Sequence, residues 1–254
     1  MDNRPIGVFD SGIGGFTIFD EIRKELPGEN IIYFGDLARV PYGSKTKENI
    51  IKFSIEICDF LMAKNVKAIV VACNTASSNA IEILSKRYSV PVIGVVKPGA
   101  ELAIRESEDS KIGLIGTKST ISSGAYSKFL GEKLIMSKAC PLFVPLVEED
   151  YLDTEAARYI AKDYLLEFED KVDSLILGCT HYPHIEGLIK ETLGEKIKII
   201  NPAKEVVRVL RESVDISGKS LGEYEIYSSD DSKGMIKYLK RLKTYKYEVM
   251  TLGS

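Results

Sequence analysis

The segment VVACNTASSNA, residues 70–80, ends an apolar run at Cys73 and continues into a polar stretch of helical character. A second segment, LILGCTHYPHI at 175–185, has the same form and ends its apolar run at Cys179. Short β-branched runs alternate with longer segments of helical period along the chain, which is typical of βαβ units and a mostly parallel sheet. Ligands of such sheets bind beyond the carboxyl ends of the strands, where we place both cysteines.

Two landmarks recur along the chain at the same interval. The runs IGVFD and IGLIG begin at Ile6 and Ile112, 106 residues apart (112 − 6), and the two cysteines are also 106 residues apart (179 − 73). A third pair, KPGAEL from Lys97 and NPAKEV from Asn201, follows with a spacing of 104 residues (201 − 97). We interpret these pairs as a weak internal repeat of two similar α/β halves.

The repeat predicts two pseudo-symmetric α/β domains, each with a mostly parallel sheet flanked by helices. The first domain would contain residues 1–97 together with the tail 208–254, and the second would contain residues 98–207. The expected strands are PIGVF, IIYFG, KAIVVA, VPVIGVV, KIGLIG, PLFV, VDSLILG and KIKII, and the expected helices include 45–64 and 154–169. In the tail we expect a helix, a strand, a helix and a strand at VVRVLRESV, YEIYSS, SKGMIKYLKRL and KYEVM. Domains that face each other would place the active site, with both cysteines, in the interdomain cleft.

The composition favours a cytoplasmic protein with a small-molecule partner. The 254 residues carry a net charge of −3, which offers no global field for attracting nucleic acid or an anionic membrane. No apolar stretch reaches the roughly 18 residues of a membrane span, and the first ten residues lead into a strand instead of a signal peptide. The four cysteines form no CxxC pair and are too few for a disulfide scaffold, so we expect free thiols.

Two thiols on opposite sides of one tetrahedral carbon can invert that carbon. A thiolate on one side removes an acidic hydrogen while a thiol on the other side delivers a proton to the opposite face. The reverse reaction exchanges the two roles, so the groups should be equivalent acids, a requirement that a matched pair of cysteines meets. Inversion of configuration therefore explains why the same thiol ends two strands.

Each thiol needs assistance, because free Cys titrates near 8.5 and is mostly protonated at neutral pH. We expect helix N-termini after both: Cys73 precedes TASSNAIEIL, and Cys179 precedes a segment in which Pro183 suits a first helical turn. His181 lies two residues beyond Cys179, within reach for proton exchange. Asp10 ends the first strand near Cys73, either as a proton acceptor or relay or as the partner of a substrate ammonium group.

The cysteines also have simpler interpretations. Cys58 lies at helical spacing among apolar residues and Cys140 lies in KACPLFVP, so we assign both to the core. Cys73 and Cys179 could be small hydrophobic residues at strand ends, since free Cys is among the most buried residue types, but their matched settings favour the functional interpretation. A zinc site built on this pair has no short ligand spacing to support it, so we expect no metal.

The glycine-rich turn FDSGIGGFTIF follows the first strand. It matches a dinucleotide fingerprint only in part, because Thr17 stands at the last glycine position of GxGxxG. As a nest of backbone N–H groups with Ser11, the turn can hold a carboxylate. The VPYGS turn and the hydroxyls of Thr75 and Thr180 can do the same, so the substrate would be a small anion.

The segments FDSGIGG, GDLARVPYGSKT, VACNTASS and LGCTHYPHI occur in this order and span essentially the full length. With them the chain resembles the glutamate racemase family, cofactor-independent enzymes that interconvert L- and D-glutamate for bacterial peptidoglycan. The GDLARVPYG segment favours the glutamate over the aspartate branch. The resemblance implies that Cys73 deprotonates the D-isomer and Cys179 the L-isomer, that Asp10 and His181 assist them, and that no cofactor takes part.

The same resemblance implies further residues of the site and a homodimer. An additional active-site carboxylate falls in PLVEED, where Glu148 is the candidate and Glu149 remains the alternative. Substrate contacts are implied for Asp10, Ser11, Tyr42, Gly43, Asn74, Thr75, Thr180 and His181.

Two other functions remain open from the sequence. An aspartate racemase or related isomerase of the same superfamily would prefer a different amino acid. A non-catalytic amino-acid-binding or nucleotide-binding protein would bind its ligand without exchanging the α-hydrogen with solvent.

Overall fold

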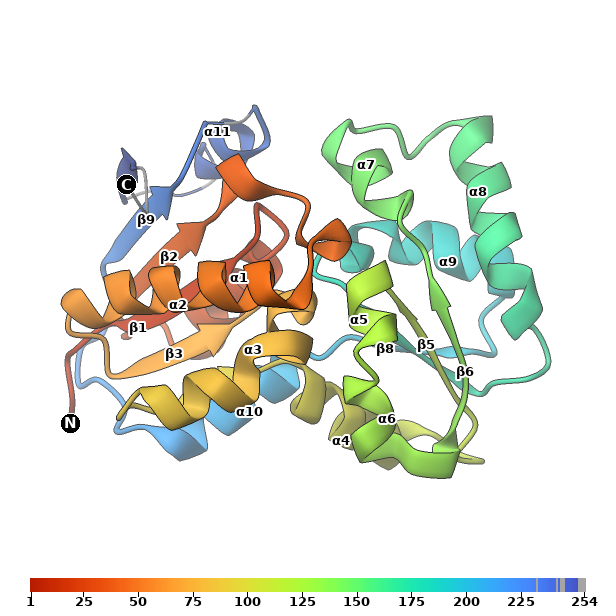
Figure 1. Ribbon diagram of the computed structural model, residues 1–254, viewed down its shortest axis with the longest axis horizontal. Helices are drawn as coiled ribbons and strands as arrows, with labels where there is room; N and C mark the ends of the chain where they lie inside the picture. Colours follow the sequence, from red (N-terminus) through yellow and green to blue (C-terminus); the bar gives the residue numbers. More distant parts are fainter. Residues whose placement is uncertain (232, 241, 243–244, 251–254) are drawn as a thin grey trace.

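The structure of the protein is a computed structural model that describes residues 1–231, 233–240, 242 and 245–250. Two parallel sheets, each with helices on both faces, occupy the left and right sides of the molecule in Figure 1. The predicted α/β fold with two pseudo-symmetric halves is therefore confirmed. Residues 251–254, which the predicted first domain includes, lie outside the described residues.

Within the described residues, the first sheet has the strand order β10-β9-β2-β1-β3-β4 and the second has the order β6-β5-β7-β8. The strands of the first sheet are β1 (Ile6–Asp10), β2 (Ile31–Gly35), β3 (Ala68–Val71), β4 (Val92–Gly94), β9 (Tyr224–Ser228) and β10 (Lys246–Val249). Those of the second sheet are β5 (Ile112–Gly116), β6 (Leu134–Ala139), β7 (Ser174–Gly178) and β8 (Lys198–Ile200).

The helices connect these strands and cover the sheets. The α-helices are α1 (Phe16–Glu25), α2 (Lys47–Ala63), α3 (Asn74–Arg87), α4 (Val96–Glu106), α5 (Lys118–Ser122), α6 (Ala125–Leu130), α7 (Phe143–Glu148), α8 (Glu155–Leu165), α9 (Glu186–Leu193), α10 (Ala203–Ser213) and α11 (Lys233–Leu239). Short 3-10 turns are η1 (Leu37–Arg39), η2 (Tyr42–Ser44), η3 (Gly131–Lys133), η4 (Leu166–Phe168) and η5 (Tyr182–Ile185).

The two sheets share one topology. The order β2-β1-β3-β4 in the first sheet corresponds to β6-β5-β7-β8 in the second. Strands β5, β7 and β8 each begin 106 residues after β1, β3 and β4 (112 − 6, 174 − 68 and 198 − 92), the interval found in the sequence. The tail strands β9 and β10 extend the first sheet beyond β2.

Buried side chains form a core on each face of both sheets. Helices α1 and α10 cover one face of the first sheet, and α2 and α3 cover the other. Helices α4 and α6 cover one face of the second sheet, and α7, α8 and α9 cover the other. Strands β1, β2, β5 and β7 are buried along their whole length, as expected for parallel strands between two helical layers.

The helix that follows the last strand of each half packs against the sheet of the other half. Helix α4 follows β4 of the first sheet, but Val96 and Ala103 lie in the core of the second sheet. Helix α10 follows β8 of the second sheet, but Val206 and Leu210 lie in the core of the first. The two helices also contact each other. The predicted boundary at 207/208 falls within α10, and the domain division at that position stays a prediction.

One expected strand is wrong. The segment PLFV forms a turn and the start of α7, while the strand of this region is β6, residues LIMSKA. Strand β6 lies at the sheet edge, so its residues alternate between half-buried and exposed and lack the continuous apolar run of the central strands. The apolar residues Phe143 and Leu146 are buried at helical spacing instead.

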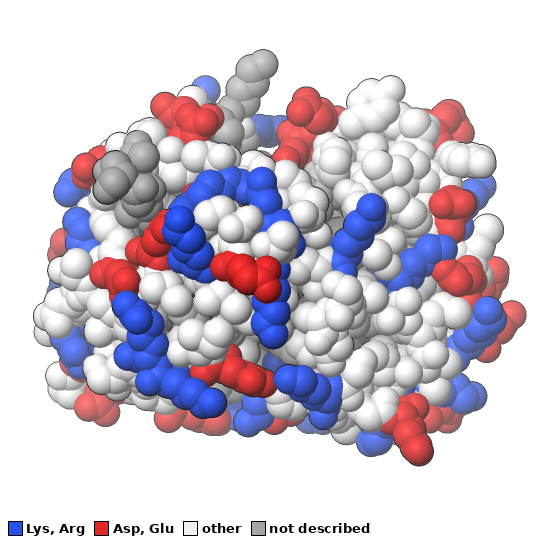
Figure 2. All heavy atoms as spheres, in the orientation of Figure 1, with Lys and Arg blue, Asp and Glu red and all other residues white. Residues whose placement is uncertain are grey.

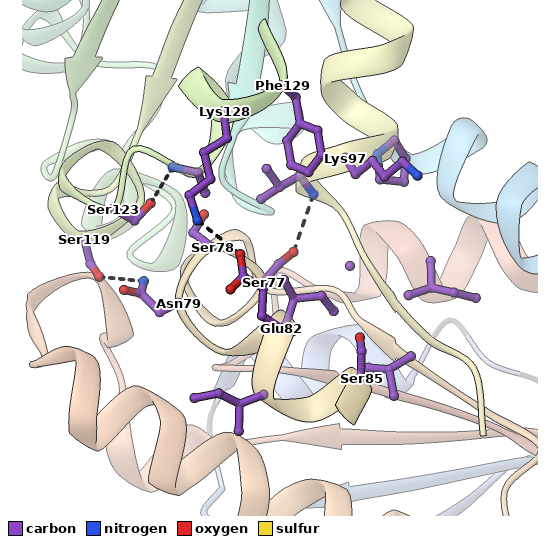
Figure 3. Close-up of a pocket in the computed structure, with 18 of the residues that line it drawn as sticks. Ser77, Ser78, Asn79, Glu82, Ser85, Lys97, Ser119, Ser123, Lys128 and Phe129 are labelled. Carbon is purple, nitrogen blue, oxygen red and sulfur yellow. Dashed lines mark hydrogen bonds and ion pairs between the residues drawn. The ribbon is translucent and has the colours of Figure 1, made fainter. Parts of the chain in front are cut away.

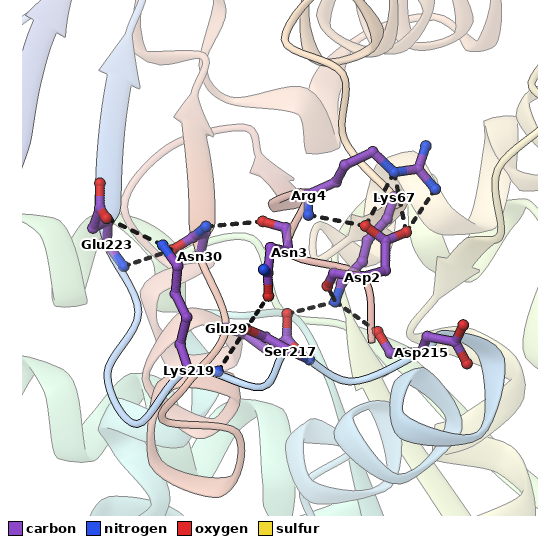
Figure 4. A network of polar contacts seen from close by, with 10 residues as sticks. All are labelled: Asp2, Asn3, Arg4, Glu29, Asn30, Lys67, Asp215, Ser217, Lys219 and Glu223. Atoms are coloured by element: carbon purple, nitrogen blue, oxygen red, sulfur yellow. Dashed lines mark hydrogen bonds and ion pairs between the residues drawn. The ribbon is translucent and has the colours of Figure 1, made fainter.

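A buried ion pair between Lys67 and Glu29 lies at the amino ends of strands β3 and β2 (Figure 4). Lys67 and Glu29 have side chains 1% and 0% exposed, and their charged atoms lie 2.7 Å apart. The Lys67 ammonium also donates to the backbone carbonyls of Asp2 at 2.7 Å and Asp215 at 2.8 Å. Glu29 accepts a hydrogen bond from the backbone N–H of Ser217 at 2.6 Å. This network ties the amino terminus and the tail to the end of the sheet opposite the cysteines.

Charged side chains of both signs are intermingled on the face of the molecule in Figure 2. On this face, the Lys and Arg side chains of the described residues are interrupted by Asp and Glu side chains, unlike the basic stripe that follows a nucleic-acid backbone. In the described part of the chain, no helix combines the length and the apolar character that crossing a membrane requires.

Candidate active site

A small cavity of about 30 Å³ lies between the two halves, at the carboxyl ends of β1, β3 and β7. Every site residue predicted from the sequence except Asp10 lines it. The wall is formed by Ser11, Val40, Pro41, Tyr42, Gly43, Cys73, Asn74, Thr75, Thr117, Val144, Glu148, Cys179, Thr180 and His181. The two cysteines thus reach one cavity from different halves, at the edge where sheets of this kind bind ligands.

Cys73 occupies the N-cap of α3 and is 5% exposed. Its thiol donates to the Ser11 hydroxyl at 3.6 Å, and the backbone N–H of Ala76 in the first helical turn is directed at the sulfur. Burial and the nearby Asp10 carboxylate nevertheless raise the pKa of Cys73 to about 12. Cys73 at rest is therefore a protonated thiol that can deliver a proton.

Cys179 belongs to a chain of three polar groups. Its sulfur lies 3.8 Å from Nδ1 of His181, whose Nε2 lies 3.1 Å from a carboxylate oxygen of Glu148. Burial alone would lower the pKa of His181, but hydrogen bonds with Cys179 and Glu148 and the charges of Cys179 and Asp10 outweigh it and raise the pKa to about 10. At neutral pH His181 is therefore an imidazolium, a cation whose Nδ1 faces the sulfur of Cys179.

The two cysteines differ in their backbone setting. The segment after Cys179 begins as the 3-10 turn η5 at Tyr182, and α9 starts only at Glu186. The expectation of a helix end at each thiol is therefore correct for Cys73, which is itself an N-cap, whereas at Cys179 a 3-10 turn with Pro183 in its first turn begins only three residues later. Pro183 lies in the first turn of η5, where its missing N–H breaks no hydrogen bond, so the tight turn is compatible with the sequence. His181 takes over the electrostatic role that a helix N-terminus plays at Cys73.

Asp10 lies behind the cavity wall. Its buried carboxylate accepts hydrogen bonds from the backbone N–H of Gly12 at 3.0 Å and from the Thr180 hydroxyl at 3.3 Å. Burial raises the pKa of Asp10 in spite of these bonds and of the nearby charge on His181. Of the two roles left open by the sequence, this position favours a proton relay over direct contact with a substrate ammonium group.

The glycine-rich turn brings the two halves together. Its Gly12 N–H is bound to Asp10, so the predicted nest holds a carboxylate of the protein itself. A Cβ on Gly14 would lie 2.4 Å from the Thr180 hydroxyl and 2.7 Å from Nδ1 of His181. Glycine at this position therefore allows the close approach of the segment that carries Cys179.

Tyr42 is held by a network outside the cavity. Its hydroxyl donates to the buried carboxylate of Asp36. Asp36 also accepts hydrogen bonds from Arg39 at 2.7 Å and from Ser229, in the tail, at 2.8 Å. Tyr42 therefore lines the cavity with its hydroxyl already bound to Asp36.

A cluster of threonines joins the halves, and two of its members, Thr117 and Thr120, were not predicted from the sequence. Thr117 lines the cavity, and its hydroxyl lies 2.9 Å from that of Thr75 and 3.0 Å from that of Thr120. Thr117 follows Ser11 by the repeat interval of 106 residues (117 − 11), a signal that could have identified it. The apolar wall residues Val40 and Val144 carry no such signal, because their sequence context is that of ordinary core residues.

A wider groove of about 1480 Å³ opens beside the cavity, between α3, α4, α5 and α6 (Figure 3). Gly43 belongs to the walls of both. The groove is crossed by an ion pair of Lys128 with Glu82 at 3.1 Å and by a hydrogen bond from Asn79 to Ser119 at 3.0 Å. None of the four cysteines lines it, so the proton-transfer chemistry belongs to the smaller cavity.

The other cysteines are structural, as predicted. Cys58 and Cys140 are fully buried in the hydrophobic cores, and all four cysteines are free. Among the residues that the structure describes, no group of three or more His, Cys, Asp and Glu side chains is arranged to hold a metal ion.

Known proteins share both the sequence and the fold. The Asp/Glu/Hydantoin racemase family model matches residues 11–210. The glutamate racemase of Geobacter metallireducens is 44% identical over 248 residues, which cover 93% of this chain and 92% of the relative. The structure of Thermus thermophilus glutamate racemase in complex with β-chloro-D-alanine has a TM-score of 0.89 at 40% identity and covers 98% of this chain and 97% of its own. That of Francisella tularensis glutamate racemase in complex with D-glutamate has a TM-score of 0.88 at 36% identity, with coverages of 99% and 98%. The chain therefore belongs to the Asp/Glu/hydantoin racemase family and, within it, to the glutamate racemases.

Proposed function

We propose that this chain interconverts L- and D-glutamate by proton transfer between the α-carbon and two cysteines, without a cofactor. The observation that carries the proposal is the position of Cys73 and Cys179 in the wall of one cavity, one from each half. The relative at 44% identity, a glutamate racemase, supports the choice of substrate. The D-glutamate formed would supply peptidoglycan synthesis, as the resemblance implies.

The unequal settings of the two thiols define the direction of the first step. With His181 cationic beside it, Cys179 acts as the base on L-glutamate: its sulfur takes the α-proton, and the electron pair of the C–H bond stays on the α-carbon. Cys73 then delivers its proton to the opposite face. The products are D-glutamate, a Cys73 thiolate and a Cys179 thiol.

The protonation state is then restored in one of two ways. D-glutamate restores it directly, because Cys73 takes its α-proton and Cys179 returns one to the other face. For a second L-glutamate, a proton must pass from Cys179 to solvent and another must reach Cys73. We assign the outward route to His181 and Glu148, whose side chain is 34% exposed.

The substrate carboxylates would be bound by neutral donors. Among the described residues, no Lys or Arg lines the cavity, whereas Ser11, Asn74 and Thr180 do. Hydrogen-bond donors of this kind, held rigidly in a buried site, bind a carboxylate in the ground state and in the transition state alike.

The cavity is too small to hold glutamate unless the two halves move apart. Small-molecule sites usually enclose about 300 to 1,000 Å³, ten or more times the volume found here. Glutamate therefore enters only when the two halves separate, and closing them excludes water from the carbanion. The contacts of Gly14 with Thr180 and His181 lie at the surface that must part.

Solvent exchange tests the proposal. The protein is incubated with L-glutamate in deuterated water without added cofactor, and the α-proton signal is followed by NMR while chiral chromatography measures D-glutamate. We expect loss of the signal together with formation of the D-isomer, and slower conversion of aspartate in a parallel sample. Binding without exchange would instead support the amino-acid-binding protein, and faster conversion of aspartate would support the aspartate racemase.

We also propose that the enzyme acts in the cytoplasm as a homodimer. Four free thiols fit a reducing compartment. The dimer is an expectation from the resemblance, and light scattering of the purified protein should give the mass of two chains.

A further inference from the structure

We infer that Tyr126 is a positioning residue of the substrate site: its hydroxyl fixes the side-chain amide of Asn74 so that the N–H groups of this amide face the substrate carboxylate. The inference rests on the proposed function and deepens it, because it names a group that acts through Asn74 without touching substrate.

The amide of Asn74 is oriented by one hydrogen bond. Asn74 is the first residue of α3, directly after Cys73, and it lines the cavity while being only 3% exposed. Its Oδ1 accepts a hydrogen bond of 2.8 Å from the Tyr126 hydroxyl. An asparagine side chain has one acceptor oxygen and one NH2 donor, so binding of the oxygen leaves the donor end for the cavity. Among the described residues, none accepts a hydrogen bond from this NH2 group.

The side chain of Tyr126 is held in one position by the packing around it. Its ring is 1% exposed and packs in the core of the second sheet, among residues that include Val96 and Ala100 of α4. A Cβ on Gly99 of the same helix would lie only 3.3 Å from the hydroxyl, so the absence of a side chain there leaves room for it. Burial raises the pKa of Tyr126, which keeps the phenol protonated as a hydrogen-bond donor throughout the working range.

The hydrogen bond also crosses between the halves. Tyr126 belongs to α6 of the second half, whereas Asn74 follows the catalytic cysteine of the first. When the halves separate to admit glutamate, this hydrogen bond breaks and the Asn74 amide is free to rotate. In the rotated orientation its oxygen would face the substrate carboxylate, and the two groups would repel each other. Closure of the two halves therefore restores the hydrogen bond and turns the NH2 group of Asn74 toward the substrate carboxylate.

Tyr126→Phe tests this inference, because it removes the hydroxyl and keeps the ring. We expect KM for both enantiomers, and the Kd of D-glutamate measured by calorimetry, to rise about tenfold, the effect of one oriented hydrogen bond. We expect kcat to stay within about twofold, since the amide binds ground state and transition state alike. Tyr88→Phe is the matched control: it loses a hydroxyl bonded to Asp59 at 2.7 Å, at the far end of α3, and should leave KM unchanged.

A double-mutant cycle with Asn74→Ala separates positioning from general weakening. If Tyr126 acts through Asn74, the double variant should have the KM of Asn74→Ala alone. The inference would be overturned if the KM increases of the two single variants multiplied in the double variant. It would also be overturned if Tyr126→Phe bound D-glutamate as tightly as the wild type. The solvent exchange of the wild type decides the proposed function independently of both.

Asn74→Asp keeps the test decisive if Tyr126→Phe does not fold. Aspartate still accepts the hydrogen bond from Tyr126 but replaces the NH2 donor by an oxygen. We expect the thermal midpoint to be preserved and the Kd of D-glutamate to rise at least about tenfold. Unchanged binding in this variant would show that no donor of residue 74 faces the substrate.

Discussion

Nε2 of His181 lies 3.1 Å from the carboxylate of Glu148. Because Nδ1 of the same ring faces the sulfur of Cys179, the two residues connect this sulfur to solvent. The carboxylate is partly exposed while the imidazole is buried, so the pair carries charge into the interior without leaving it uncompensated. The neighbouring Glu149 ends α7 in an exposed position. Of the two glutamates that the sequence left open, the structure places Glu148 against the histidine.

Replacing Glu148 by Gln should shift the pH dependence of racemisation. Without its charged partner, the pKa of His181 should fall from about 10 toward the ordinary value of 6.5. The imidazolium exists only below its pKa, so the high-pH limit of kcat/KM should move to lower pH, and the rate at pH 8 should fall about 10- to 100-fold. A pH profile of kcat/KM and an NMR titration of His181 measure both effects.

Glu149→Gln serves as the matched control for this prediction. It removes the same charge one residue further along the chain, and we expect its profile to follow the wild type. A similar shift in both variants would assign the effect to general electrostatics and not to the contact with His181.

Each single cysteine should exchange hydrogen without inverting configuration. Cys73→Ser keeps Cys179, which can remove the α-proton of L-glutamate and return a deuteron to the same face. Cys179→Ser keeps Cys73, which should exchange the α-hydrogen of D-glutamate more slowly because this thiol is protonated at rest. Inversion should fall by at least about a thousandfold in both variants. Mass spectrometry of the separated enantiomers after incubation in deuterated water measures both processes. Two-way inversion at the wild-type rate in either variant would refute the two-thiol mechanism.

Gly14→Ala should weaken both folding and catalysis. The added Cβ would meet the Thr180 hydroxyl at 2.4 Å and the His181 ring at 2.7 Å, so the segment that carries Cys179 must move away. We expect a loss of about 1 to 3 kcal/mol in the free energy of unfolding and at least a tenfold loss in kcat/KM. Gly187→Ala is the control, because nothing lies within 4 Å of its added Cβ in α9 and it should stabilise the protein by up to about 1 kcal/mol. Equal activities of the two variants would contradict the packing argument.

Lys67→Met should destabilise the protein without changing its chemistry. It leaves the buried carboxylate of Glu29 without a counter-ion, which typically costs about 3 to 5 kcal/mol. The pair lies at the end of the sheet opposite the cavity, so KM and kcat of the folded enzyme should stay at wild-type values. Urea unfolding and steady-state kinetics measure the two quantities. Lys97→Met, which removes an ion-pair partner that is 66% exposed, should change the unfolding free energy by less than about 0.5 kcal/mol.

The fold could be predicted because equivalent segments of the two halves recur in the sequence at a constant interval. The spacing of 106 residues between Cys73 and Cys179 is also the spacing between β1 and β5, so the same landmarks locate the strands and the thiols. Prediction failed at β6, since an edge strand with one exposed side does not need a continuous apolar run. It failed again at PLFV, where a short apolar run is compatible with either a strand or the buried side of a helix.

The site could be predicted only where the chemistry is local. His181 lies two residues from Cys179, so its contact with the sulfur could be anticipated from spacing. The bond between Tyr126 and Asn74 joins residues 52 positions apart on different halves, and nothing near Tyr126 in the sequence distinguishes it from a core tyrosine. The burial of Asp10 behind the wall also depends on how the glycine turn packs, which single-residue patterns do not determine.

The exchange of α4 and α10 between the two halves has a consequence for the order of assembly. While the chain is being synthesised, the first sheet lacks the cover that Val206 and Leu210 provide until more than four fifths of the residues have emerged. The core of the second sheet, by contrast, lies within residues 96–200 and is complete in sequence before α10 emerges. The first sheet is therefore the last to receive its full cover, after both cysteines have left the ribosome.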